Sequence, residues 1–119
     1  MSTEERYQNA HKIVRLAPGL RFDSSVHGVW QHQRLVTLSE VPYRFLDYLC
    51  QHPRQLVPME TLRTVGWDNP SQRTLSDIYR VIHQLRQVIE PPNHPKILIS
   101  EHGLGYVLLI PHQPPPYFN

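Results

Sequence analysis

One continuous stretch, residues 73–110, constrains the fold more than any other part of the chain. It begins RTLSDIYRVIHQLRQVIE, passes through a proline-rich break, and ends KILISEHGLGYVLLI. In the first half, apolar residues recur at helical spacing and polar residues collect on the opposite side. The second half has two short apolar runs around a glycine-bearing turn, which is typical of a β-hairpin. The stretch therefore predicts a long amphipathic helix, over about residues 73–89, followed directly by a hairpin over about residues 96–110.

The predicted helix separates an apolar stripe from a polar face. The stripe consists of Leu75, Ile78, Ile82, Leu85 and Ile89, flanked by Val81 and Val88. The polar face gathers Arg73, Ser76, Arg80, His83, Gln84 and Gln87. An α-helix fits the major groove of DNA, where arginine recognises guanine edges and glutamine pairs with adenine. These polar residues are therefore candidates for reading DNA, although an ordinary solvated helix surface has the same pattern.

The chain before this stretch adds a small sheet and two further helices. Residues 13–37 alternate in short runs broken by turn signals, which predicts an antiparallel meander of three or four strands. Ser39 is a good N-cap for a first helix that ends at His52-Pro53, and a shorter helix is expected at Met59–Val65. Residues 66–70 are expected to form a loop. The resulting order predicts an α+β fold, a winged helix-turn-helix with an N-terminal antiparallel sheet, three helices and a C-terminal hairpin wing.

Length and composition limit the domain count and the compartment. The 119 residues suit one domain with a modest core. We expect a flexible N-terminus at 1–12, the winged helix at 13–110 and a proline-rich tail or linker at 111–119. The single cysteine, Cys50, has no disulfide partner within the chain and lies in an apolar run, so a buried thiol and a reducing, cytoplasmic location are expected. The net charge of +2 has the sign that suits nucleic acid, but it is small.

The residue types offer little for catalysis. We find no set of nucleophile, base and orienting residue, and no glycine-rich phosphate loop after a strand. The histidines do not follow a known metal-ligand spacing. The sequence therefore predicts a protein that is not an enzyme, with no cofactor, metal or small-molecule substrate.

At this point the chain resembles a known family, the OmpR/PhoB-type winged-helix DNA-binding domain. The resemblance covers about residues 13–110 and rests on LSEVPYRFLDYL, VPMETLRTV, RTLSDIYRVIHQLR and HGLGY, in that order and spacing. Several positions depart from the family pattern. Pro42 replaces a usual glutamate, Gly66 separates Val65 from Trp67, and Arg73-Thr74 falls about one turn early. In the wing, Glu101 and His102 stand where valine and arginine are usual, which lowers the positive charge of the expected DNA face.

The resemblance implies a bacterial transcription regulator that binds double-stranded DNA. The third helix would enter the major groove while the wing contacts the backbone or the minor groove. The implied contact residues are Arg73, Thr74, Ser76, Arg80, His83, Gln84, Arg86, Gln87, Lys96, Ser100, His102 and Tyr106. Arg86 either touches phosphate or pairs with a carboxylate of the domain. Tyr106 is expected to pack its ring inside first and to offer its hydroxyl second.

The family resemblance also suggests further partners. The loop at 66–73 is a candidate contact for RNA polymerase, with Trp67 either a core residue or an exposed anchor, and protomers would bind DNA as dimers or in tandem. An alternative function is a winged helix used for protein contact, with weak or no DNA binding. The regulatory input stays open between a phospho-receiver domain, a membrane anchor beyond residue 119 as in regulators resembling ToxR and CadC, and a standalone regulator.

Overall fold

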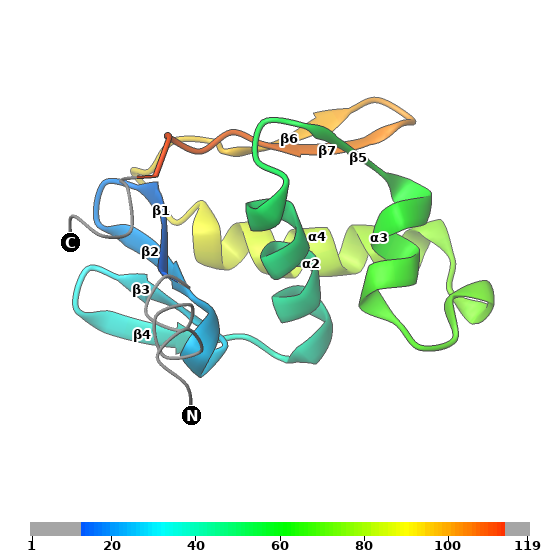
Figure 1. Ribbon diagram of the computed structural model, residues 1–119, viewed down its shortest axis with the longest axis horizontal. Helices are drawn as coiled ribbons and strands as arrows, with labels where there is room; N and C mark the ends of the chain where they lie inside the picture. Colours follow the sequence, from blue (N-terminus) through cyan, green and yellow to red (C-terminus); the bar gives the residue numbers. More distant parts are fainter. Residues whose placement is uncertain (1–12, 114–119) are drawn as a thin grey trace, which may run out of the picture.

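The computed structural model describes residues 13–113, and the expectations for residues 1–12 and 114–119 lie outside them. Two antiparallel sheets flank three helices (Figure 1). The elements follow in chain order: β1 (Ile13–Ala17), β2 (Leu20–Asp23), η1 (Ser24–Val26), β3 (Gly28–Gln31), β4 (Arg34–Thr37), α2 (Glu40–Gln51), β5 (Leu56–Pro58), α3 (Met59–Gly66), η2 (Pro70–Gln72), α4 (Leu75–Ile89), β6 (Leu98–Glu101) and β7 (Gly105–Leu108). This arrangement confirms the predicted α+β winged helix.

The N-terminal meander has four strands in sequential order, β1-β2-β3-β4. Alternation along β2 buries Leu20 and Phe22 and leaves Arg21 exposed on the other face. A short 3-10 turn joins β2 to β3 and ends at His27, whose φ of 49° is left-handed. The sheet therefore packs one face against the helices and leaves the other face exposed.

The first helix, α2, begins directly after Ser39 as expected, but the Ser39 side chain makes no capping hydrogen bond. Pro42 lies in the first turn, where an amide hydrogen has no partner within the helix, and its ring is buried. Cys50 is partly buried and packs against the core. Burial raises the pKa of its thiol, which opposes formation of a thiolate nucleophile.

The strand β5 was missed by the sequence analysis. Three residues are too few for a visible alternation, and Leu56–Pro58 forms a strand because it pairs with β7. The wing is consequently the outer part of a three-stranded sheet in the order β5-β7-β6, not an isolated hairpin. Gly105 is required where the two strands meet, because a Cβ at this position would collide with the carbonyl oxygen of Val57.

The third helix, α4, lies against the other two helices and supplies much of the core. Its buried residues are Ile78, Val81, Ile82, Leu85 and Ile89. The prediction was wrong for Leu75, which is 55% exposed at the first position of the helix, beyond the edge of the core. The loop prediction also needs correction, since Gly66 ends α3 and Pro70–Gln72 forms a 3-10 turn.

Candidate nucleic-acid interface

The start of α4 is set by a capping box. The Thr74 hydroxyl accepts from the Asp77 amide at 3.4 Å, and the Asp77 carboxylate accepts from the Thr74 amide at 2.9 Å. The hydrogen bond from the Thr74 backbone lowers the pKa of Asp77. The helix therefore starts at Leu75, so the predicted start at residue 73 was wrong by two residues. Arg73 and Thr74 precede the helix, and the Thr74 side chain is occupied as its cap.

Polar side chains gather on the solvent side of α4. The exposed members of the predicted face within the helix are Ser76, Arg80, His83, Gln84 and Gln87. The Arg80 side chain is 70% exposed, with one long ion pair of 3.6 Å to Asp77. The side chains of His83 and Gln87, one turn apart, lie 3.3 Å from each other. This face combines a cation with several hydrogen-bonding groups, which is what base edges and phosphates require.

Arg73 lies over the indole of Trp67, with 5.3 Å between the guanidinium carbon and the ring centroid. The same indole forms an edge-to-face contact with buried Phe45, with 5.7 Å between the ring centroids. The Arg73 carbonyl oxygen also accepts a 3.1 Å hydrogen bond from Arg63. The structure therefore favours a core role for Trp67, because the ring is partly buried, packs against Phe45 and is contacted by Arg73.

Arg86 points along the edge of α4 toward the wing. Its Nη2 donates to the carbonyl oxygen of Leu98 at 2.8 Å and lies 3.2 Å from the Ser100 hydroxyl. Its guanidinium carbon is 5.8 Å from the ring centroid of Tyr106. Of the two roles considered for Arg86, the contacts agree with a role inside the domain. The main partners, however, are a backbone carbonyl and a hydroxyl, with a carboxylate as a longer contact.

Glu90, directly after α4, was not singled out from the sequence. Its side chain is 2% exposed, and Oε2 accepts hydrogen bonds from the amides of Ile97 and Leu98 at 2.8 Å each. Oε1 lies 3.8 Å from Arg86 Nε and 3.9 Å from Lys96 Nζ. A glutamate at a helix end gives no sign of burial in the sequence, because only the folded wing brings two amides to it.

The wing carries the remaining predicted residues. Ser100 and His102 are exposed, and so is Lys96, which precedes β6. Tyr106 is 4% exposed, and burial raises the pKa of its phenol, against the opposing effect of a hydrogen bond with Ser100. Tyr106 therefore holds the wing from inside, in the structural role that was expected first.

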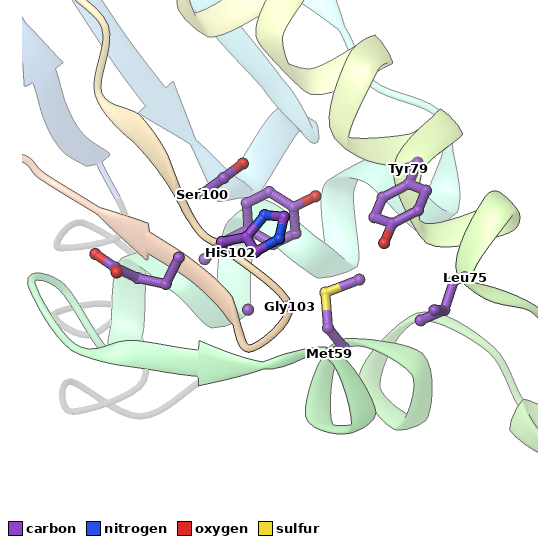
Figure 2. Close-up of a pocket in the computed structure, with 9 residues that line it drawn as sticks. Met59, Leu75, Tyr79, Ser100, His102 and Gly103 are labelled. Carbon is purple, nitrogen blue, oxygen red and sulfur yellow. The ribbon is translucent and has the colours of Figure 1, made fainter.

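A cleft of about 270 Å³ lies between α4 and the wing (Figure 2). Leu75 and Tyr79 come from α4, Met59 from α3, and Ser100 and His102 from the wing. Tyr79 is 51% exposed and was missed, because its spacing from Leu75 and Ile82 places it beside the apolar stripe. The cleft places Leu75 and Tyr79 of α4 beside the wing, and a second groove brings His83 and Gln87 together with Lys96, so one edge of the exposed face of α4 borders the wing.

Comparisons with known proteins agree with this architecture. Residues 32–108 match the family described as "Transcriptional regulatory protein, C terminal". The chain belongs to this family. Since the match includes all three helices and the wing, it confirms the family suggested by the sequence motifs. The family is one of transcriptional regulators, in agreement with the expectation that the chain is not an enzyme.

Individual relatives are distant. The response regulator MprA of Mycobacterium avium is 24% identical over 102 residues, which are 84% of this chain and 44% of MprA. The DNA-binding domain of E. coli CadC has a TM-score of 0.74 at 20% identity, covering 85% of this chain and 94% of that domain. The DNA-binding domain of Klebsiella pneumoniae RstA, solved in complex with the RstA box, has a TM-score of 0.61 at 22% identity, covering 83% and 98%. The chain thus spans less than half the length of MprA, and the structural likeness shows a shared fold.

Two further properties concern the described residues only. Histidine, cysteine, aspartate and glutamate side chains within residues 13–113 form no group of three or more that could hold a metal ion. Each helix in the same range is too short or too polar to cross a lipid bilayer.

Proposed function

We propose that the domain binds double-stranded DNA, with the exposed face of α4 in the major groove and the wing on the backbone or in the adjacent minor groove. The observation that carries the proposal is the exposed polar face of α4, on which the Arg80 side chain is 70% exposed and His83 and Gln87 line a groove together with Lys96. The DNA-binding domains of CadC and RstA, which share this fold, support the same use of it here. The proposed reading residues are Ser76, Arg80, His83, Gln84 and Gln87, with Lys96, Ser100 and His102 on the wing side.

The proposed roles of the other predicted residues differ. Arg73 lies over Trp67 at the N-terminal end of α4 and presents its remaining donors to a phosphate. Thr74 caps the helix, and the buried Tyr106 supports the wing. We expect these three residues to position the interface and not to contact base edges. The resulting charge is modest, so we expect modest affinity per protomer and binding as dimers or on tandem half-sites, where a second contact compensates.

A salt series tests the proposal. A pool of duplexes with randomised cores is enriched on the domain, and the affinity of the enriched duplex is measured by fluorescence anisotropy from 50 to 300 mM salt. Log affinity should fall linearly with log salt, because each neutralised phosphate releases counterions. A domain that enriches no sequence and shows no binding at the lowest salt would overturn the proposal.

The second candidate function is contact with another protein, such as RNA polymerase, through residues 66–73. It is favoured by the low net charge and by the exposed Glu101 at the wing, which would repel phosphate. Because Trp67 packs on Phe45, the surface that this segment offers is polar, with Asp68 89% exposed and bonded to Arg44 at 3.3 Å. Pull-down of polymerase by the domain, lost in Asp68→Lys but retained in Arg80→Ala, would favour this candidate.

The location and the regulatory input of the whole protein are also proposals. A domain that binds chromosomal DNA would act in the bacterial cytoplasm, whether alone, beside a receiver domain or tethered to a membrane. A receiver domain, a membrane anchor and a standalone regulator are the three arrangements that the proposal includes.

A further inference from the structure

The last turn of α4 is bonded to the base of the wing by a set of contacts that the proposed DNA-reading face does not use. Arg86 and Glu90, one helical turn apart, both reach β6 or the residue before it. Glu90 accepts from the Ile97 and Leu98 amides, while Arg86 donates to the Leu98 carbonyl oxygen. The Glu90 carboxylate thus binds the amide of Leu98, and the Arg86 guanidinium binds the carbonyl oxygen of the same residue.

The contacts have the geometry of a support for the wing. Arg86 Nε lies 3.8 Å from Glu90 Oε1, so the two side chains steady each other as well as the strand. The Arg86 guanidinium also lies over the Tyr106 ring of β7, at 5.8 Å, and its Nη2 is 3.2 Å from the Ser100 hydroxyl. One side chain of α4 therefore contacts both strands of the wing, beside a groove that also includes Glu90 and Lys96.

We infer that Arg86 is a positioning residue, which sets the angle of the wing against α4 and so acts on DNA through the wing rather than by a phosphate contact of its own. This inference rests on the proposed DNA binding. The planar guanidinium donates to Leu98 and Ser100 while its carbon lies 5.8 Å from the centroid of the Tyr106 ring. A lysine keeps the charge but lacks the planar fork, so it cannot reproduce this arrangement.

The first test uses the free protein and does not depend on DNA. Amide hydrogen exchange is followed by NMR in the wild type, Arg86→Lys, Arg86→Gln and the control Arg21→Gln, whose residue lies on the outer face of the N-terminal sheet. In both Arg86 variants, the amides of β6 and β7 should exchange about tenfold faster or more, while α2 amides, which report global unfolding, change little. Wing exchange equal to that of the wild type, or equal acceleration in α2, would overturn the inference.

The second test measures duplex affinity in a double-mutant cycle. Arg86→Lys and Arg86→Gln should lose affinity alike, about tenfold, because restoring the charge does not restore the support. In a background where Lys96 and His102 are both alanine, Arg86→Gln should cost about twofold or less, since the wing contacts that it serves are already gone. A lysine variant that binds like the wild type, or losses that simply multiply, would indicate a direct phosphate contact and overturn the inference.

The two tests separate the inference from the proposed function. If the wild type binds no duplex, the DNA proposal fails, and the exchange measurement still decides whether Arg86 supports the wing. If the wild type binds and the exchange pattern of the wing is unaffected by Arg86, the inference fails and the DNA proposal stands.

Discussion

The outer face of α4 and its wing-facing edge use the same residue type differently. Arg80 lies on the outer face with a side chain 70% exposed and one ion pair of 3.6 Å. Arg86, less than two turns later, lies on the edge with a side chain 36% exposed, two hydrogen bonds to β6 and a ring beneath it. Most donors of the arginine on the outer face are exposed and can bind a ligand. The donors of the arginine beside the strand are instead bonded within the domain.

Contacts within the domain also reduce the number of arginines available at the proposed interface. Of the arginines that the sequence assigned to DNA, one covers Trp67 and one supports the wing. At the wing tip, His102 is next to Glu101. The binding strength of this domain therefore depends more on Arg80 than the number of basic residues suggests.

The largest expected effect lies at the wing-facing edge and concerns stability. Glu90→Ala should lower the free energy of unfolding by about 3 kcal/mol, because the buried amides of Ile97 and Leu98 lose their acceptor. Urea denaturation measures this. The matched control is Glu101→Ala on the exposed wing tip, which should change the same free energy by less than about 0.5 kcal/mol. Equal losses of unfolding free energy in the two variants would contradict the expected difference between the wing-facing edge of α4 and the exposed wing tip.

On the outer face, the expected effect is on binding. Arg80→Ala should weaken duplex affinity about tenfold, or about 1.4 kcal/mol, because a charged donor to a base or phosphate is removed. Its unfolding midpoint in urea should stay close to that of the wild type. Arg21→Ala serves as the control for loss of one charge and should bind within about twofold. Wild-type affinity of Arg80→Ala would mean that this face does not meet DNA.

A charge reversal at the wing tip tests whether the tip lies close to the phosphates of bound DNA. Glu101→Lys should raise duplex affinity severalfold at low salt. The slope of log affinity against log salt should steepen by about 0.9 for one added phosphate contact. Anisotropy titrations at four salt concentrations measure the slope. An unchanged slope would place the tip away from the backbone and favour the protein-contact function.

The smallest expected effect concerns the cap at the start of α4. The pKa of Asp77 is lowered in the folded domain, so its contribution to stability is present above the usual carboxyl pKa of about 3.9 and is lost as the pH falls through the folded value. Asp77→Asn should therefore melt at a lower temperature than the wild type at pH 7. The gap should narrow by pH 2.5. A gap that is constant across this range would show that the charge of Asp77 does not contribute.

The sequence was sufficient for features that depend on local pattern. The N-terminal meander, predicted with three or four strands and found with four, the starts of α2 and α3, the buried residues of α4 from Ile78 to Ile89 and the turn between β6 and β7 follow from alternation, helical spacing and turn residues. The turn is one residue shorter than predicted, because Gly105 begins β7. Errors fall where the pattern is short or where an element ends. The strand β5 has three residues, and Leu75 continues the apolar spacing past the edge of the core.

The roles of individual side chains at the candidate site were decided by tertiary contacts. Helical spacing placed Arg86 near the boundary of the apolar stripe, and it could not reveal that Leu98 and Tyr106 lie beside that boundary. Likewise, no local pattern distinguishes the buried Glu90 from a solvated glutamate at a helix end.

What the sequence alone determined is the order of elements and the polar face of α4, because hydrophobic periodicity and turn chemistry are properties of neighbouring residues. What only the tertiary structure decided is which charges on that helix remain available to a ligand. That depends on the wing, whose strands begin nearly ten residues after α4 ends and fold back against it. The availability of a charge is a property of contacts between distant segments, and local sequence does not encode such contacts.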